Sequence, residues 1–156
     1  MKKGMLLLPA IVLLVAVVAF TDDAVDHEIS LLKMDIQKEK VQLIGANMHF
    51  TPADAAKFWP IYDQYNNELS KIRDERVMMI KEYAESGGTL TDEKARDLTG
   101  RWFQTEEARL RLKKKYADEL NKVLPATTVA RFLQIENQLN LLTDLQIAES
   151  IPLVEK

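Results

Sequence analysis

TPADAAKFWPIYDQYNNELSKIRDERVMMIKEY, residues 51–83, is the stretch that decides the fold of this chain. Spacings of alternately four and three residues select a set that is almost entirely apolar or aromatic: Phe58, Tyr62, Tyr65, Leu69, Ile72, Arg76, Met79 and Tyr83. This spacing predicts one long helix with a single apolar side. A lone helix cannot bury such a side, so the other segments of the chain must cover it.

The composition also favours helices. The 156 residues fit one domain, and they include only five Gly and five Pro, which is few for a fold with many turns. We therefore predict an all-α fold of four long helices with a helical-hairpin architecture. Cysteine is absent, which excludes disulfides, thiolate nucleophiles and Cys-based zinc sites.

The N-terminus has the pattern of an export signal. Lys2 and Lys3 precede an apolar run at residues 5–20, and two aspartates follow that run. Small residues before the boundary predict cleavage after Ala19, with Ala24 as the alternative point. The prediction is a signal peptide at residues 1–19 and one all-α domain at residues 20–156, located in the periplasm. The alternative is an uncleaved inner-membrane anchor, because the uncharged residues 4–21 reach the minimum length for a span.

The charge of the mature chain argues against nucleic acid as a partner. The net charge changes from −3 to −5 on cleavage, because the signal segment carries two lysines and no acid. The densest basic cluster is the run at residues 113–115, whose side chains point in different directions around a helix. An acidic chain without a segregated basic face is a poor nucleic-acid binder.

The first two predicted helices have clear boundaries. Residues 23–44 form the first helix, and Gly45 and Asn47 suit its end. Thr51 is the predicted N-cap of the second helix, with Pro52 in its first turn. Pro60 either bends this second helix or divides it in two, since proline removes a hydrogen-bond donor from a helix interior.

A hairpin joins the second and third predicted helices. Gly87-Gly88 ends the second, and Thr91 caps the start of the third. Hairpin geometry places Phe103 opposite Ile72, Tyr116 opposite Trp59, and Arg76 near Asp97. The predicted buried side of the third helix is Ala95, Leu98, Trp102, Leu112, Tyr116 and Val123. A fourth helix, residues 126–148, is apolar on more than one face, which favours deep burial or an oligomer interface.

The sequence offers no catalytic or metal-binding arrangement. His27 and His49 lie 22 residues apart, near opposite ends of the first predicted helix, so they cannot share one ion. Asp23 and His27 provide only half of a zinc site. No serine occupies a glycine-flanked elbow, and glycine is too rare for a phosphate-binding loop. We predict that the protein is not an enzyme and has no cofactor and no metal site.

Two adjacent aromatic pairs are the candidate partner-binding residues. Phe58 with Trp59, and Trp102 with Phe103, each place neighbouring rings about 100° apart around a helix. One member of each pair therefore tends to point away from the core. Exposed rings on a long helical surface form an apolar patch that suits protein partners.

A family resemblance supports the same outline. It rests on KVQLIGANMHFTPADAAKFWPIYDQY (residues 40–65), LKKKYADELNKVLPATTVARFLQIENQ (112–138) and IAESIPLV (147–154). These segments resemble a group of uncharacterised secreted bacterial helical proteins. More distantly, the layout is similar to the Spy/CpxP-like (LTxxQ) periplasmic proteins. That resemblance implies a helical-hairpin fold and a role as an ATP-independent chaperone or as an accessory of envelope stress or metal response.

These observations lead to one functional expectation and two alternatives. We expect a non-catalytic binding protein for envelope proteins or unfolded polypeptides, and a homodimer, because one chain covers only part of its hairpin faces. The first alternative is a metal-responsive periplasmic accessory or sensor that uses the acidic N-terminus. The second is a structural envelope protein held by an uncleaved anchor.

Overall fold

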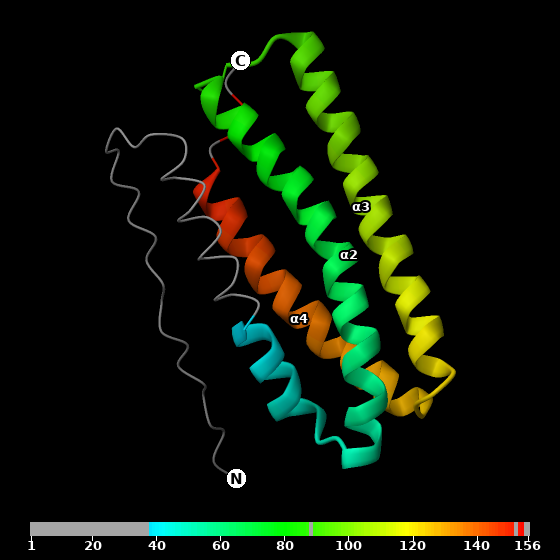
Figure 1. Cartoon of the computed structure of the whole chain (residues 1–156). Coiled ribbons are helices and arrows are strands. Elements are labelled where there is room, and N and C mark those ends of the chain that lie inside the picture. Colours follow the sequence, from blue (N-terminus) through cyan, green and yellow to red (C-terminus); the bar gives the residue numbers. More distant parts are fainter. Residues whose placement is uncertain (1–37, 88, 152, 155–156) are drawn as a thin grey trace. The chain divides into compact units, whose positions relative to one another are not determined.

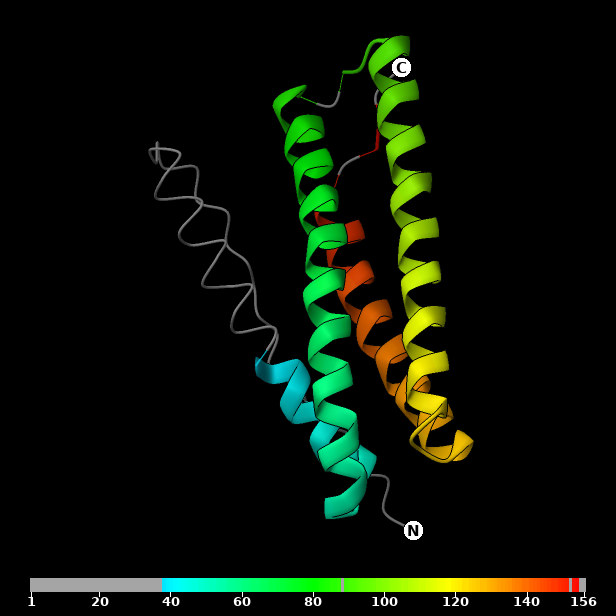
Figure 2. The same ribbon diagram turned by 45° about the vertical axis from the view of Figure 1, so that its right-hand side comes forward.

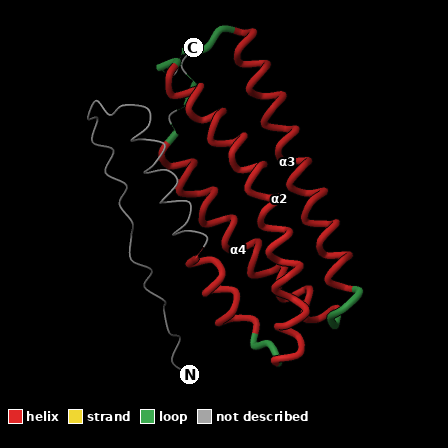
Figure 3. The backbone as a smooth tube through the Cα atoms, in the orientation of Figure 1, coloured by secondary structure: helices red, strands yellow, loops and turns green. Residues whose placement is uncertain are grey.

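The described part of the chain is all-α, as predicted. The computed structural model describes residues 38–87, 89–151 and 153–154. Its helices are α2 (Pro52–Glu85), α3 (Asp92–Asn121) and α4 (Ala126–Ser150), and residues 38–48 are also helical. No strand occurs within those residues (Figure 3). The chain divides into two units, Met1–Lys38 and Glu39–Lys156, and α2, α3 and α4 lie in the second.

The predicted start of α2 is confirmed in detail. The Thr51 hydroxyl oxygen accepts a hydrogen bond from the Asp54 backbone N–H at 3.1 Å and donates one to the Asp54 carboxylate at 2.8 Å. This cap satisfies one of the amide groups that a helix N-terminus leaves without a partner. Pro60 lies inside a continuous helix, so the alternative of two separate helices is wrong.

The predicted hairpin of α2 and α3 is also confirmed (Figures 1 and 2). Gly87 has a φ of 63°, a left-handed conformation that glycine adopts without steric cost, and it follows Ser86, the C-cap of α2. Thr91 then caps α3 by accepting from the Lys94 N–H at 3.2 Å. Arg101 on α3 forms ion pairs with Glu75 at 2.7 Å and Glu82 at 2.9 Å on α2.

The predicted register of the hairpin is only partly correct. Lys94 pairs with Glu82 near the turn, as expected for facing residues. Further from the turn, Tyr116 donates to Glu68 at 2.7 Å and lies beside Tyr65, not opposite Trp59. Arg76 does not meet Asp97, because it reaches Asp144 on α4 at 2.8 Å. The register between the two helices therefore changes with distance from the turn.

The helical segment 38–48 extends past its predicted end. The helix continues through Gly45 because Ile44 and Met48, four residues apart, are both buried in the core. His49 then ends it with a φ of 51°. The start predicted for this helix, at residue 23, and the signal peptide lie outside the described residues. Among the helices that are described, none combines the length and apolar character needed to cross a membrane.

One hydrophobic core joins all of these helices. It contains most of the apolar positions predicted for α2, together with residues of segment 38–48, α3, the α3–α4 loop and α4. Its buried members are Ile44, Met48, Phe58, Tyr62, Tyr65, Leu69, Leu112, Tyr116, Leu120, Leu124, Val129 and Phe132. The aromatic rings of α2 stack within it, with Phe58 and Tyr62 at 5.5 Å between centroids.

Candidate functional site: the exposed apolar residues of α3 and α4

The structure separates the two predicted partner-binding pairs. Phe58 is 0% exposed, and Trp59 is partly buried against the same core, so the α2 pair is part of the packing. Trp102 is 47% exposed and Phe103 is 57% exposed, so the α3 pair lies on the surface. The prediction that Trp102 and Val123 belong to the buried side is therefore wrong. Phe58 offers no accessible surface to a partner.

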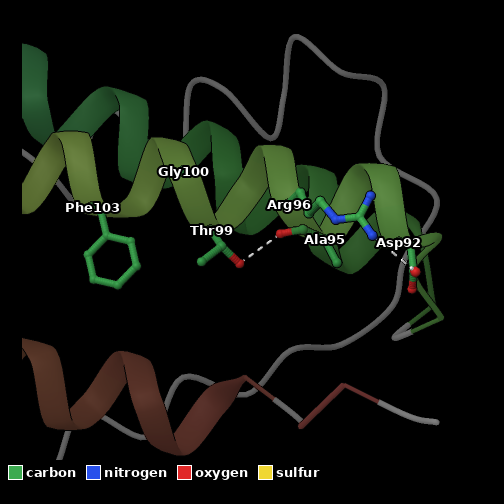
Figure 4. A pocket seen from close by; sticks show the side chains of 6 residues that line it. All are labelled: Asp92, Ala95, Arg96, Thr99, Gly100 and Phe103. Carbon is green, nitrogen blue, oxygen red and sulfur yellow. Dashed lines mark hydrogen bonds and ion pairs between the residues drawn. The ribbon is translucent and has the colours of Figure 1, made fainter.

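Trp102 and Phe103 form an aromatic pair on the surface of α3. Their ring centroids are 4.8 Å apart with the planes at 62°, an edge-to-face arrangement that aromatic pairs favour. Phe103 also borders an open hollow of about 490 Å³ whose other lining residues are Asp92, Ala95, Arg96, Thr99 and Gly100 (Figure 4). Small or short side chains line its middle, which leaves one side of the Phe103 ring open.

More apolar side chains are exposed on the same pair of helices. Leu110 follows Phe103 by seven residues on α3, so the two share a side of that helix. Leucines also project from the C-terminal half of α4. The exposed apolar residues of α3 and α4, which we call the α3/α4 apolar set, are Trp102, Phe103, Leu110, Leu141, Leu142 and Leu145.

An ion-pair network holds these parts of α3 and α4 together. The Asp144 carboxylate on α4 accepts from Arg76 at 2.8 Å and from Arg109 at 3.1 Å. Partial burial alone would raise the pKa of Asp144, but the hydrogen bonds from the two arginines outweigh burial and hold that pKa below its usual range. Arg109 is adjacent to Leu110, and Asp144 is adjacent to Leu145. The network therefore holds Leu110 on α3 and Leu145 on α4 at similar positions along the two helices.

A second polar cluster lies inside the core. The Glu136 side chain on α4 is 0% exposed, and its Oε1 accepts from Lys40 Nζ at 2.7 Å and from the Tyr65 hydroxyl at 2.9 Å. Burial lowers the pKa of the Lys40 ammonium, and the Glu136 carboxylate opposes that shift. Burial also raises the pKa of Tyr65, and the charge of Glu136 adds to the effect. The cluster joins segment 38–48, α2 and α4 at one point.

Two atoms beside this cluster are not satisfied within the described residues. Glu136 Oε2 and the Tyr62 hydroxyl are both buried and have no hydrogen-bond partner there. Burial, with a further contribution from Glu136, raises the pKa of Tyr62 and so keeps its proton on the oxygen. A buried water between such groups is the common solution in globular proteins. Because the ammonium and the carboxylate are buried, we interpret this cluster as a structural contact between helices and not as an accessible reaction site.

The described residues contain no group of three His, Cys, Asp or Glu side chains that could hold a metal ion. His49 is exposed at the end of segment 38–48. Asp23 and His27, the predicted half-site, lie outside the described residues.

Comparisons with known proteins do not assign this chain to a family. No family model matches it, and no curated protein and no solved structure matches it either.

Proposed function

We propose that this protein is a non-catalytic periplasmic binding protein that holds apolar segments of other envelope proteins or of unfolded polypeptides, in the manner of an ATP-independent chaperone. The observation that carries the proposal is the exposure of the α3/α4 apolar set. Exposed aromatic and leucine side chains on a folded domain commonly mark a surface for protein partners. Trp102 and Phe103 are the residues on which we expect binding to depend most.

The architecture supports this role in a second way. The Arg76–Asp144–Arg109 network and the α2–α3 ion pairs hold the exposed residues on rigid helices. A rigid platform loses little conformational entropy when it binds, so more of the contact energy appears as affinity. Charged side chains such as Arg96 and Glu107 flank the aromatic pair along α3, which keeps the domain soluble while the rings stay exposed.

Aggregation of an unfolding model protein tests the proposal directly. The mature domain, residues 20–156, should slow aggregation in the absence of ATP. The Trp102→Ala/Phe103→Ala variant should need about thirtyfold more protein for half-maximal suppression, because truncating an aromatic anchor typically costs about 1 kcal/mol and the two losses add. Light scattering at several protein-to-client ratios measures this difference.

Met78→Ala is the matched control, because Met78 on α2 is exposed to a similar degree, at 49%. It should suppress aggregation as well as the unaltered domain. Circular dichroism must show that all variants remain folded. If the double variant suppresses aggregation as well as the control does, the apolar set is not the binding surface. If the unaltered domain itself does not suppress aggregation at any ratio, the chaperone role is refuted.

We also propose export with cleavage after Ala19, on the N-terminal pattern of two lysines, an apolar run and an acidic flank. Expression of the full chain in a bacterium with two membranes should give a product in the periplasmic fraction. Its intact mass should correspond to residues 20–156. A full-length mass in the membrane fraction would instead establish an uncleaved anchor.

A further inference from the structure

A row of exposed residues on α3 has the pattern of a self-complementary interface. Its members follow one another at spacings of four, four, three, four and four residues, so they lie along one side of the helix. We call this row the α3 outer stripe. It consists of Asp92, Arg96, Gly100, Phe103, Glu107 and Arg111, all of them exposed.

The stripe points away from the hairpin partner. Thr105, Leu112 and Tyr116 are buried and mark the side of α3 that faces the core. At about 100° per residue, Phe103 lies roughly 160° around the helix from Thr105. Figure 4 shows Phe103 projecting from α3 beside Thr99 and Ala95, next to the position where Gly100 carries no side chain. A second helix can therefore approach the stripe without displacing α2.

The stripe is complementary to a second copy of itself that runs in the opposite direction. A second α3 that runs antiparallel, with the two-fold axis between Arg101 and Trp102, sets Asp92 opposite Arg111. The same register sets Arg96 opposite Glu107 and Gly100 opposite Phe103. Each contact occurs twice because the interface is isologous. Every charged position of the stripe then faces a charge of the opposite sign.

We propose that α3 pairs antiparallel with α3 of a second copy of this chain through the outer stripe. The pairing covers Phe103 and so withholds part of the α3/α4 apolar set until a client competes for it. This second consequence rests on the proposed function, whereas the pairing itself does not.

Gly100 is the strongest single indication of a close neighbour. Glycine is among the least favourable residues inside a helix, and Gly100 lies in the interior of α3. A Cβ atom built at this position meets nothing within 4 Å among the described residues, so packing inside the chain does not require glycine there. In the proposed pair, the missing side chain leaves room for the Phe103 ring of the second copy. The open hollow beside Gly100 provides that room.

The charges set the direction and register of the pair. Within one chain, Arg96 pairs with Asp92 at 3.4 Å and Arg111 with Glu107 at 3.1 Å, and all four side chains are largely exposed. Exposed pairs of this kind contribute little to stability, so they can rearrange across an interface at little cost. A parallel, in-register pair would place like charges together, which electrostatics disfavours. The association is therefore weak and depends on protein concentration.

Charge-reversal variants test the pairing. Arg96→Glu places Glu opposite Glu107 twice, and Glu107→Arg places Arg opposite Arg96 twice. Each variant alone should raise the dissociation constant of the dimer by about tenfold or more, since the repulsion acts at two symmetric positions. An equimolar mixture of the two variants should associate as well as the unaltered protein, because a mixed pair restores every opposite charge. Sedimentation equilibrium of residues 20–156 measures all three.

Lys57→Glu is the control for net charge, because Lys57 is exposed on α2 and the change equals that of Arg96→Glu. It should leave the dissociation constant unchanged. Equal masses for Arg96→Glu and Lys57→Glu at every concentration would overturn the pairing. A mixture that associates no better than its components would overturn the antiparallel register.

Gly100→Gln provides a second, independent readout. Gln is a better helix former than Gly, so this variant should melt at a higher temperature than the unaltered domain. It should nevertheless dimerise less, because the new side chain occupies the place of the Phe103 ring. Undiminished dimerisation would refute the contact between Gly100 and Phe103.

The masking of the client surface has its own test. Arg96→Glu should suppress aggregation at a lower chain concentration than the unaltered domain, since more of its Phe103 is accessible. If the average mass of Arg96→Glu in sedimentation equilibrium falls but its suppression of aggregation does not improve, the masking is wrong and the pairing stands. Because the masses are measured without client, a failure of the chaperone role leaves the result on the pairing intact.

Discussion

Lys40→Met is expected to lower the free energy of unfolding by about 3–5 kcal/mol. Lys40 Nζ lies 2.7 Å from Glu136 Oε1, and the Glu136 carboxylate has no exposure to solvent. Methionine keeps the unbranched side chain but removes the ammonium, so the buried carboxylate keeps only hydrogen bonds from neutral groups such as Tyr65. Urea denaturation of residues 20–156 at neutral pH, followed by circular dichroism, measures the loss.

A double variant separates the pair from the rest of the core. Replacing both members, in Lys40→Met/Glu136→Leu, should recover most of the loss, because no buried charge then lacks a partner. Lys57→Met is the matched control at an exposed lysine and should change stability by less than about 0.5 kcal/mol. If Lys40→Met matches this control, the buried pair does not form in solution.

The elements with short-range causes were predictable from the sequence. Thr51 and Thr91 cap α2 and α3 as expected, because a cap depends on a hydroxyl and an amide only three residues apart. The apolar spacing of α2 likewise identified Phe58 and Leu69 as core residues. Helical periodicity reports which side of a helix is apolar, and in α2 the apolar side is the buried one.

The register between helices was not predictable in the same way. The hairpin estimate placed Arg76 near Asp97, but Arg76 pairs with Asp144 on α4 at 2.8 Å. A two-helix estimate cannot include a third helix, and α4 decides where this guanidinium points. Trp102 was misplaced for a related reason. α3 is long, and its N-terminal half is covered less completely than the apolar pattern suggested.

The buried cluster has a mark in the sequence, a charged residue on the apolar side of each of two helices. Val129, Phe132 and Glu136 follow one another at spacings of three and four, so the acid lies on the apolar side of α4. Lys40 likewise precedes the buried Ile44 by four residues. A charge on an apolar side predicts a buried partner of opposite charge. It cannot identify that partner across the 96 residues that separate Lys40 from Glu136, because only the fold brings them together.

Phe58→Ala should destabilise the domain by about 3–5 kcal/mol, the range for removing a large aromatic side chain from a core. Phe58 is 0% exposed, and its ring centroid lies 4.6 Å from that of Phe50 and 5.1 Å from that of Phe132. It therefore connects the start of α2 with α4. Truncation leaves a cavity between these two elements, and neither can move to fill it without losing its other contacts. Thermal and urea unfolding of residues 20–156 measure the effect.

Phe103→Ala is the matched control for Phe58→Ala. The residue type and the change are identical, but Phe103 is more than half exposed, so the free energy of unfolding should change by less than about 0.5 kcal/mol in the monomer. Client binding should respond in the opposite order, with a loss for Phe103→Ala and none for Phe58→Ala at temperatures where that variant is folded. Equal losses of stability for the two variants would mean that Phe103 is buried in solution. In that case the aromatic pair of α3 would not be available as a binding surface on the isolated chain.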